Sequence, residues 1–206
     1  MSRWQKKRRM MRRYDITAEM YDTRYAEEQA AKIEAALKRV AIESHDRVLD
    51  SGCGTGVLFD YIADKAKLIV GVDISRKTLV QAIRHVQRKS LSNVHLVQAD
   101  MDNLPFGDGV FSKVFSLTVL QNSPEYTETL AEIKRTGMTE AAFVVTGLKS
   151  IFSKSIFERL LTKSQLKIVA FEEEDLKCYV AVCTNSALSK SPFGSDNSGT
   201  PAKQKD

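Results

Sequence analysis

Four residues of unusual spacing stand where one apolar run ends and the next begins. In VLDSGCGTGVLFDYI, residues 48–62, Asp50 is followed on alternate positions by Gly52, Gly54 and Gly56. Glycine inside a regular element lowers stability, so three in so short a span indicate a turn whose backbone a ligand approaches. The carboxylate of Asp50 at the start of this turn repels phosphate groups and attracts a cation.

The glycine spacing distinguishes this turn from two common phosphate-binding loops. G-x-G-x-G differs from the G-x-G-x-x-G of dinucleotide-binding folds, and it lacks the Gly-Lys-Ser/Thr of loops that hold triphosphates. The turn also contains no lysine that would neutralise a phosphate. A ligand with an ammonium group and a ribose but no phosphate fits better, and S-adenosylmethionine is such a ligand.

Two further carboxylates follow the next two apolar runs. Asp73 comes 21 residues after Gly52, which is the usual offset for a carboxylate that accepts hydrogen bonds from ribose hydroxyls. Asp100 ends the following run, where a carboxylate can accept from an adenine amino group while Met101 packs on the ring. Any one such acid is also typical of a solvated strand end. Three of them after successive runs, beside a glycine turn, predict one adenosyl-binding site.

Alternating elements are expected to position these residues. Strands are predicted at 47–50, 67–73, 94–100, 110–120, 141–147, 166–173 and 177–184, and helices at 16–43, 55–65, 75–89, 125–135 and 153–164. A short acidic turn joins the last two strands, so we expect them to pair antiparallel. Strands that alternate with helices predict a doubly wound α/β sheet with right-handed crossovers. Its ligands bind at the C-terminal strand ends, where the glycine turn falls.

The two ends of the chain differ in composition from the middle. Residues 1–13 form a basic arm with seven cations and no acid. We expect this arm to contact RNA phosphates while Trp4 and Tyr14 stack on bases, and the alternative is a solvated leader. Residues 185–206 are rich in Ser, Pro, Gly, Asn and Lys, which predicts a disordered tail.

Length and composition exclude several classes of protein. A chain of 206 residues has room for one sizeable core, and we expect no second full domain. No run approaches the roughly 18 apolar residues of a membrane span. The basic N-terminus is not followed by the apolar segment of a signal peptide, so we expect a cytoplasmic protein without membrane contact. The cysteines and histidines are scattered without ligand spacing, so we expect no metal site.

The motifs resemble those of class I S-adenosylmethionine-dependent methyltransferases, in particular the methyltransferase type 11 group, over residues 14–184. VLDSGCGTG is similar to the first motif of this family, GVDIS (71–75) to the second and QADMDNLPF (98–106) to the third. The resemblance implies a Rossmann-like, seven-stranded, mostly parallel sheet of order 3-2-1-4-5-7-6, with an antiparallel last strand and helices on both faces. The methyltransferase domain would then span residues 14–184 and begin with a helix over the cofactor.

The resemblance also implies roles for individual residues. Asp50 would face the methionine amino group, Asp73 would hold the ribose, and Asp100 would hold the adenine together with Met101. YDITAEMYDTRY (14–25) is similar to a leading helix whose tyrosine closes over the methionine end, and helix packing is the competing role of its tyrosines. The implied cofactor-binding set is Tyr14, Tyr21, Asp50, Ser51, Gly52, Gly54, Asp73, Ile74, Asp100, Met101 and Leu117.

The chemistry of this family makes a catalytic base optional. Methyl transfer is an in-line displacement at an already activated methyl group, so alignment and exclusion of water do most of the work. LQNSPEY (120–126) partly resembles the Asn/Asp-Pro-Pro-Tyr/Phe segment of amino-methylating enzymes. Asn122 is therefore the candidate catalytic residue, as a group that orients the acceptor, and its alternative role is that of a turn residue near a proline.

The acceptor remains open at this level. The first hypothesis is an RNA, tRNA or rRNA, or another component of translation, reached through the basic arm. The alternatives are a small molecule enclosed by the leading helix, and a cofactor-binding subunit that acts only with an activating partner protein. An NAD or nucleotide-sugar enzyme is disfavoured by the glycine spacing. Two segments depart from the family pattern, Phe111-Ser112 and RTGMTEA (135–141), and they weaken assignment to a subfamily.

Overall fold

The computed structural model describes residues 2–185, except for the side chains of residues 13–14 and 17–26. The predicted tail therefore lies outside the described residues apart from Asn185, and so do the side chains of Tyr14 and Tyr21. Within the described residues, the sheet has seven strands in the order β3-β2-β1-β4-β5-β7-β6. This order confirms the expected topology.

The strands and helices alternate as predicted along most of the chain. Strands β1 to β5 are parallel to one another, whereas β7 is antiparallel to both β5 and β6. The C-terminal ends of β1 to β4 therefore meet at one edge of the sheet. The elements are α1 (Arg3–Leu37), β1 (Arg47–Ser51), α2 (Phe59–Ile62), β2 (Leu68–Asp73), α3 (Arg76–Lys89), β3 (Val94–Gln98), β4 (Phe111–Ser116), η1 (Leu120–Asn122), α4 (Tyr126–Thr136), β5 (Gly137–Leu148), α5 (Lys154–Lys163), β6 (Leu166–Glu172) and β7 (Cys178–Asn185).

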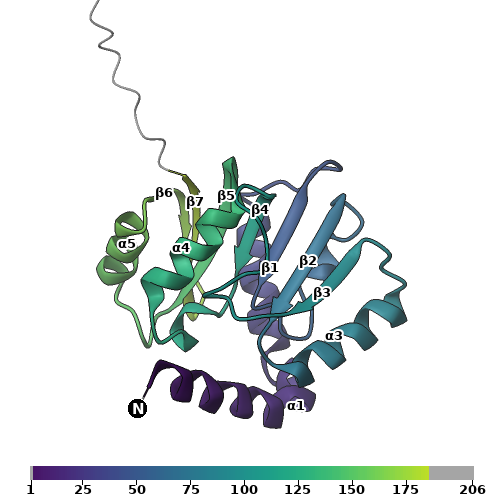
Figure 1. The fold of residues 1–206 in the computed structure, drawn as a ribbon. Helices are drawn as coiled ribbons and strands as arrows, with labels where there is room; N and C mark the ends of the chain where they lie inside the picture. The colour runs from purple at the N-terminus through teal and green to yellow at the C-terminus, as the bar shows by residue number, and fades with distance from the viewer. Residues whose placement is uncertain (1, 186–206) are drawn as a thin grey trace, which may run out of the picture.

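The central strands are nearly continuous apolar runs because helices cover both faces of the sheet. On one face, α4 and α5 contribute buried residues such as Leu130 and Phe157 to a core around Phe143. On the other face, Ile33 of α1 and Phe59 of α2 pack in a second core, which α3 completes (Figure 1). The two cores hold the strand ends, and hence the glycine turn, in fixed positions.

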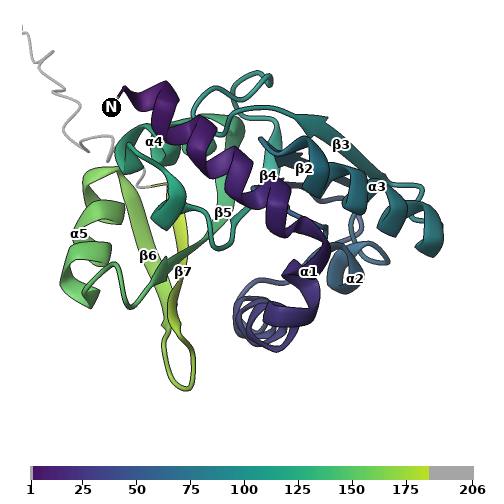
Figure 2. The same cartoon turned by 90° about the horizontal axis from the view of Figure 1, so that it is seen from below.

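Helix α1 is longer at its start than the sequence predicted. It begins at Arg3 rather than at residue 16, because Ser2 and Gln5 form a capping box in which each side chain bonds the other's backbone N–H (2.8 and 3.3 Å). Most of the expected basic arm is thus helical. Seen from below, the first half of α1 crosses the ends of the strands from α4 towards α3 (Figure 2). Its second half turns away and packs against the sheet.

Two other segments also differ from the prediction. The helix expected over 55–65 is reduced to α2 (Phe59–Ile62), after the positive-φ turn at Gly54 and Gly56. The strand expected over 110–120 stops at Ser116, because Thr118 adopts a φ of 63° and the chain then enters η1. Both differences open space at the C-terminal edge of the sheet.

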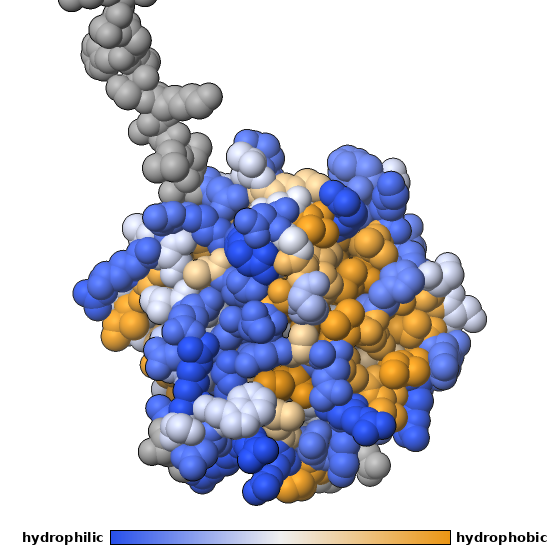
Figure 3. Space-filling view, viewed as in Figure 1, coloured by the Kyte–Doolittle hydropathy of each residue, from blue (hydrophilic) through white to orange (hydrophobic). Residues whose placement is uncertain are grey.

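The connection from β3 to β4 contains turns rather than a helix over residues 99–110. Apolar residues gather on the surface over β2, β3 and α3 (Figure 3). On α3, Val80 and Ile83 are 38% and 43% exposed. The side of the molecule near β3 is therefore more apolar at its surface than the side covered by α4 and α5.

In the part of the chain that the structure describes, no helix has both the length and the apolar character needed to cross a membrane.

Candidate functional site

A pocket lies at the C-terminal edge of the sheet, beneath α1. Its empty volume is about 770 Å³, which includes space open to solvent. The loops after β1, β2, β3 and β4 contribute its walls, as expected for a ligand of a doubly wound sheet. Eight of the residues predicted from sequence line it: Asp50, Gly52, Gly54, Asp73, Ile74, Met101, Leu117 and Asn122.

The glycine turn exposes its backbone to this pocket. Gly52 and Gly54 have φ values of +85° and +55°, which side-chain-bearing residues rarely adopt. The amides of Gly52 and Cys53 both donate to the carbonyl oxygen of Val72, at 2.7 and 2.9 Å. A Cβ at Gly52 would lie 2.3 Å from Val119, whereas a Cβ at Gly54 would meet no atom within 4 Å. The backbone at Gly54 therefore faces free space that a ligand can fill.

Asp73 fastens the glycine turn to the end of β2. Its Oδ2 accepts a hydrogen bond from the amide of Gly54 (3.0 Å), and its Oδ1 accepts one from the amide of Ser75 (2.8 Å). Burial raises the pKa of Asp73, and these backbone hydrogen bonds oppose that rise. The Thr78 hydroxyl and the Ile74 amide also lower this pKa, so Asp73 is a strong hydrogen-bond acceptor in the pocket wall, the kind of group that can bind a diol such as that of ribose.

Asp50 is a buried acid in the floor of the pocket. It is 3% exposed, and burial, with the negative charge of Asp73 as a second cause, raises its pKa to about 8. In the free protein at pH 7 the carboxyl group therefore holds its proton. A cation placed beside it would favour the carboxylate and expel that proton.

Helix α1 is tied to the first turn of α3 above the pocket. Asp15 Oδ1 accepts hydrogen bonds from Ser75 Oγ (2.6 Å) and from the amide of Lys77 (3.4 Å). Ser75 is also the N-cap of α3, since its Oγ accepts from the amide of Thr78 (3.3 Å). Met10 of α1 lines the pocket directly. The leading helix thus forms a roof over the site.

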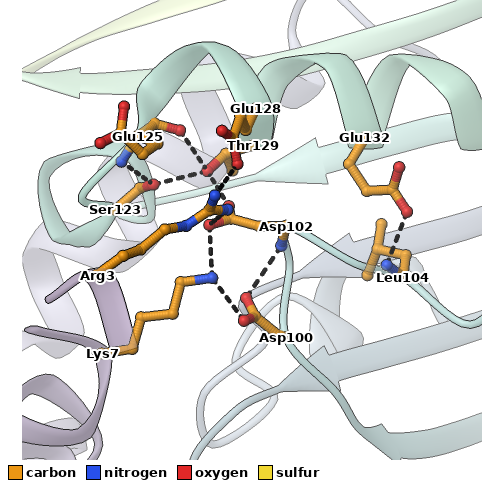
Figure 4. A network of polar contacts seen from close by, with 10 residues as sticks. All are labelled: Arg3, Lys7, Asp100, Asp102, Leu104, Ser123, Glu125, Glu128, Thr129 and Glu132. Atoms are coloured by element: carbon orange, nitrogen blue, oxygen red, sulfur yellow. Dashed lines mark hydrogen bonds and ion pairs between the residues drawn. The ribbon is translucent and has the colours of Figure 1, made fainter. Parts of the chain in front are cut away.

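A second tie joins the start of α1 to the β3–β4 connection and α4 (Figure 4). Lys7, which is 5% exposed, places Nζ 2.5 Å from Asp100 Oδ2 and 2.6 Å from Asp102 Oδ2. Arg3 pairs with Asp102 at 2.9 Å and with Glu128. Burial works to raise the pKa of Asp102, but hydrogen bonds from Lys7, Thr129 and Arg3 outweigh it and hold that pKa below its usual value. Two cations of the expected RNA-binding arm therefore point inward.

Two predicted cofactor residues do not line the described pocket. Asp100 directs one oxygen to Lys7 and the other to the amide of Asp102 (3.0 Å), although its neighbour Met101 lies in the pocket wall. Ser51 is fully buried at the end of β1. Their contacts with a cofactor stay predictions.

Asn122 lies in the pocket wall and also braces the loop after β4. Its Nδ2 donates to the carbonyl oxygen of Thr118 at 3.0 Å. This contact gives Asn122 the turn-stabilising role that was its alternative. Its proposed part in orienting an acceptor stays a prediction.

Sequence reasoning missed the residues that hold α1 over the site. Arg3 and Lys7 share one helix face by their four-residue spacing, and the Ser2–Gln5 capping box was the available signal that a helix starts before them. Lys32 directly precedes Ile33 on the apolar stripe of α1 and is only 1% exposed. A lysine on a stripe of this kind was the signal for a buried cation.

Comparisons with known proteins agree with this geometry. A family described as "Methyltransferase domain" matches residues 42–191. The chain is 32% identical over 117 residues to a malonyl-[acyl-carrier protein] O-methyltransferase of Marinomonas sp. (strain MWYL1), covering 56% of this chain and 42% of that protein. It is 33% identical over 105 residues to a demethylmenaquinone methyltransferase of Staphylococcus saprophyticus, covering 48% of this chain and 43% of that protein. The chain thus spans less than half the length of these two relatives.

The fold is shared with solved structures at low identity. A Haloferax volcanii methyltransferase in complex with the Trm112 methyltransferase activator superposes with a TM-score of 0.73 and 17% identity. The match covers 84% of this chain and 97% of that one. At this identity, the likeness supports the arrangement of the sheet and helices.

Proposed function

This chain belongs to the methyltransferase-domain family and has the class I fold, and on that premise we propose that it transfers a methyl group from S-adenosylmethionine to a small acceptor molecule beneath α1. The observation that carries the proposal is one pocket at the strand ends that unites the glycine turn, the buried Asp50, the half-buried Asp73 and a helical roof.

The described residues fit the cofactor. The free space at Gly54 would accommodate a ligand against bare backbone, and Asp73 in the pocket wall would accept from the ribose diol. Asp50 would accept from the methionine ammonium, and Met101 would pack on the adenine ring. When bound, S-adenosylmethionine supplies a methyl group that its sulfonium already activates. The chain's own residues then orient the acceptor and exclude water.

The pocket favours a small, partly apolar acceptor. Met10, Ile33, Leu117 and Val119 contribute apolar side chains to its wall. The names of the two relatives above refer to malonyl-[acyl-carrier protein] and to demethylmenaquinone, and the second of these is a small apolar molecule. Helix α1 also covers the strand ends, so an acceptor must fit between this roof and the loop after β4 that carries Asn122.

Methyl-labelled S-adenosylmethionine tests the proposal directly. The full chain is incubated with separated metabolite and RNA fractions, and incorporated label is counted in each. We expect label in the metabolite fraction and none with Asp73→Ala, which removes the ribose acceptor. Label confined to RNA would overturn the small-acceptor proposal but leave the methyltransferase assignment intact. No transfer to any fraction, with the protein folded, would count against the activity itself.

RNA is the second candidate acceptor, because the outward face of α1 remains basic. Lys6, Arg8, Arg9 and Arg12 are exposed, and the Arg8 guanidinium lies 5.8 Å from the ring centroid of the exposed Trp4. Cations beside an exposed aromatic ring suit a phosphate backbone with a stacked base. If RNA is the acceptor, its retention must fall steeply as salt rises.

An activating protein partner is a further proposal. The Haloferax volcanii methyltransferase is complexed with an activator, and this chain exposes Val80 and Ile83 on α3. We expect a partner to bury these two side chains and raise turnover. If Ile83→Lys copurifies with the partner and turns over as wild type does, the proposal that a partner binds this surface is wrong.

A further inference from the structure

Lys32 is a buried cation near the methyl-donor pocket. Its side chain is 1% exposed, although lysine is almost never fully buried without a partner. Its Nζ lies 2.9 Å from Thr118 Oγ1 and 3.2 Å from Glu28 Oε1. Only Thr118 of these two partners lines the pocket, so Lys32 acts on the pocket through that hydroxyl.

Thr118 is held in a backbone conformation that β-branched residues rarely adopt. Its φ is +63°, and such strain persists only where the surroundings fix it. Its amide donates to Thr146 Oγ1 (2.7 Å), and its carbonyl oxygen accepts from Asn122 Nδ2 (3.0 Å). Because Lys32 donates to Thr118 Oγ1, the hydroxyl proton is directed elsewhere, and Gln29 Oε1 is 3.5 Å away. A bond of that length is readily exchanged for a shorter one to a ligand.

Among the described residues that line the pocket, none offers a positive charge to a ligand. The charged side chains among the described lining residues are Asp50 and Asp73, both acids. The methionine end of the cofactor carries a carboxylate as well as an ammonium group, and neither acid supplies a positive charge to that carboxylate. The strand order places Met101, Asp73, Asp50 and Thr118 in succession along the edge of the sheet. Thr118 therefore lies next to the acid expected to take the ammonium group.

We propose that the Thr118 hydroxyl, backed by the Lys32 ammonium group, binds the carboxylate of the cofactor's methionine end. The hydroxyl donates to the carboxylate while its oxygen accepts from Lys32, whose ammonium group also pairs with Glu28, so Lys32 orients and polarises the hydroxyl without entering the pocket. Asp50 of β1 then binds the ammonium group of the methionine end, and Thr118, which follows the adjacent β4, binds its carboxylate. This inference rests on the proposed use of S-adenosylmethionine.

Calorimetry with two ligands tests the inference without any turnover. Decarboxylated S-adenosylmethionine keeps the adenosine, the sulfonium and the ammonium group and lacks only the carboxylate. Wild type should bind S-adenosylmethionine about 10- to 100-fold more tightly than this analogue, the range expected for a hydrogen bond to a charged group. Thr118→Val keeps the shape of the side chain and should bring this ratio close to one, with affinity for the analogue retained.

Two more variants separate the inference from a general disturbance. Lys32→Met should lower the same ratio, because Thr118 loses the charge behind it. Thr78→Val is the matched control, since Thr78 lines the pocket near Asp73 and donates to the carbonyl oxygen of Ser75 (2.9 Å). It should change both affinities by the same factor. Thermal melting of each variant establishes that it is folded, and Thr118→Val alone suffices if Lys32→Met does not fold.

The outcomes distinguish this inference from the function on which it rests. If wild type binds S-adenosylmethionine and Thr118→Val keeps the wild-type ratio, the carboxylate site is refuted and the methyltransferase assignment stands. If folded wild type binds neither ligand, the proposed function fails and this inference fails with it. A ratio lowered in Thr118→Val and unchanged in Thr78→Val supports the site.

Discussion

The buried carboxyl group of Asp50 favours stability in its protonated form and cofactor binding in its ionised form. Its raised pKa of about 8 means that the native state holds a proton which the unfolded chain releases near pH 4. Between these values, native stability falls as pH rises, by at most about 1.4 kcal/mol per pH unit. The same residue is the one expected to pair with the ammonium group of the cofactor.

Asp50→Asn should therefore stabilise the ligand-free protein and abolish cofactor binding. The amide cannot ionise, so the gain in melting temperature over wild type should be small at pH 5 and larger at pH 8. Thermal melts at several pH values, without cofactor, measure this difference. A difference in melting temperature between Asp50→Asn and wild type that is the same at every pH would contradict the buried, protonated state of Asp50.

The glycine turn offers a matched pair of substitutions. A Cβ at Gly54 meets only open pocket, so Gly54→Ala should cost about 1–2 kcal/mol for its positive φ and weaken cofactor binding by filling ligand space. A Cβ at Gly52 collides with Val119, so Gly52→Ala should destabilise the fold more. Chemical denaturation and calorimetry separate the two effects. A Gly54→Ala protein that binds the cofactor as wild type does would place the ligand elsewhere.

At the scale of elements, helix α1 is held over the site by polar ties at its first half. Lys7 pairs with Asp100 and Asp102, and Asp15 accepts from Ser75. A predominantly polar attachment of this kind can open without loss of the hydrophobic cores beneath it. The cofactor must pass this roof to reach Asp50, which makes α1 the element expected to control its exchange.

Lys7→Met should loosen the roof, because it removes the buried cation between two carboxylates. We expect faster amide hydrogen exchange in the first half of α1, faster release of S-adenosylmethionine in stopped flow and little change in the exchange of β1. Arg9→Met is the matched control, since Arg9 is an exposed cation on the same helix. Equal exchange and release in Lys7→Met and wild type would show that Lys7 does not secure the roof.

At the scale of the whole molecule, the sequence predicted the elements of the fold better than the orientations of individual side chains. The C-terminal pocket could be predicted, since Asp50 and Asp73 end strands whose apolar runs are unambiguous, whereas the strand order was predicted only from the resemblance to a known family. The orientation of Asp100 could not, because it depends on Lys7, 93 residues away in sequence. The bend at Thr118 also escaped prediction, since a threonine carries no local signal for a positive φ and here is fixed by contacts with Lys32 and Thr146.

The contacts made by the start of α1 could not be predicted from the sequence either. Charge alone led to the prediction of a basic arm over residues 1–13, because seven cations without an acid suggest a solvated segment. The structure instead pairs Arg3 and Lys7 with acids of the β3–β4 connection and α4. Such long-range pairs are visible only once the fold brings the segments together.

The most direct test of the whole account is a calorimetric titration of the full chain with S-adenosylmethionine, with NAD as the competing ligand and Asp73→Ala as the matched variant. We predict one site with a dissociation constant in the micromolar range, release of a proton at pH 7 as Asp50 ionises, and no binding by a folded Asp73→Ala protein. Binding of NAD in preference to S-adenosylmethionine, or undiminished binding by Asp73→Ala, would contradict it.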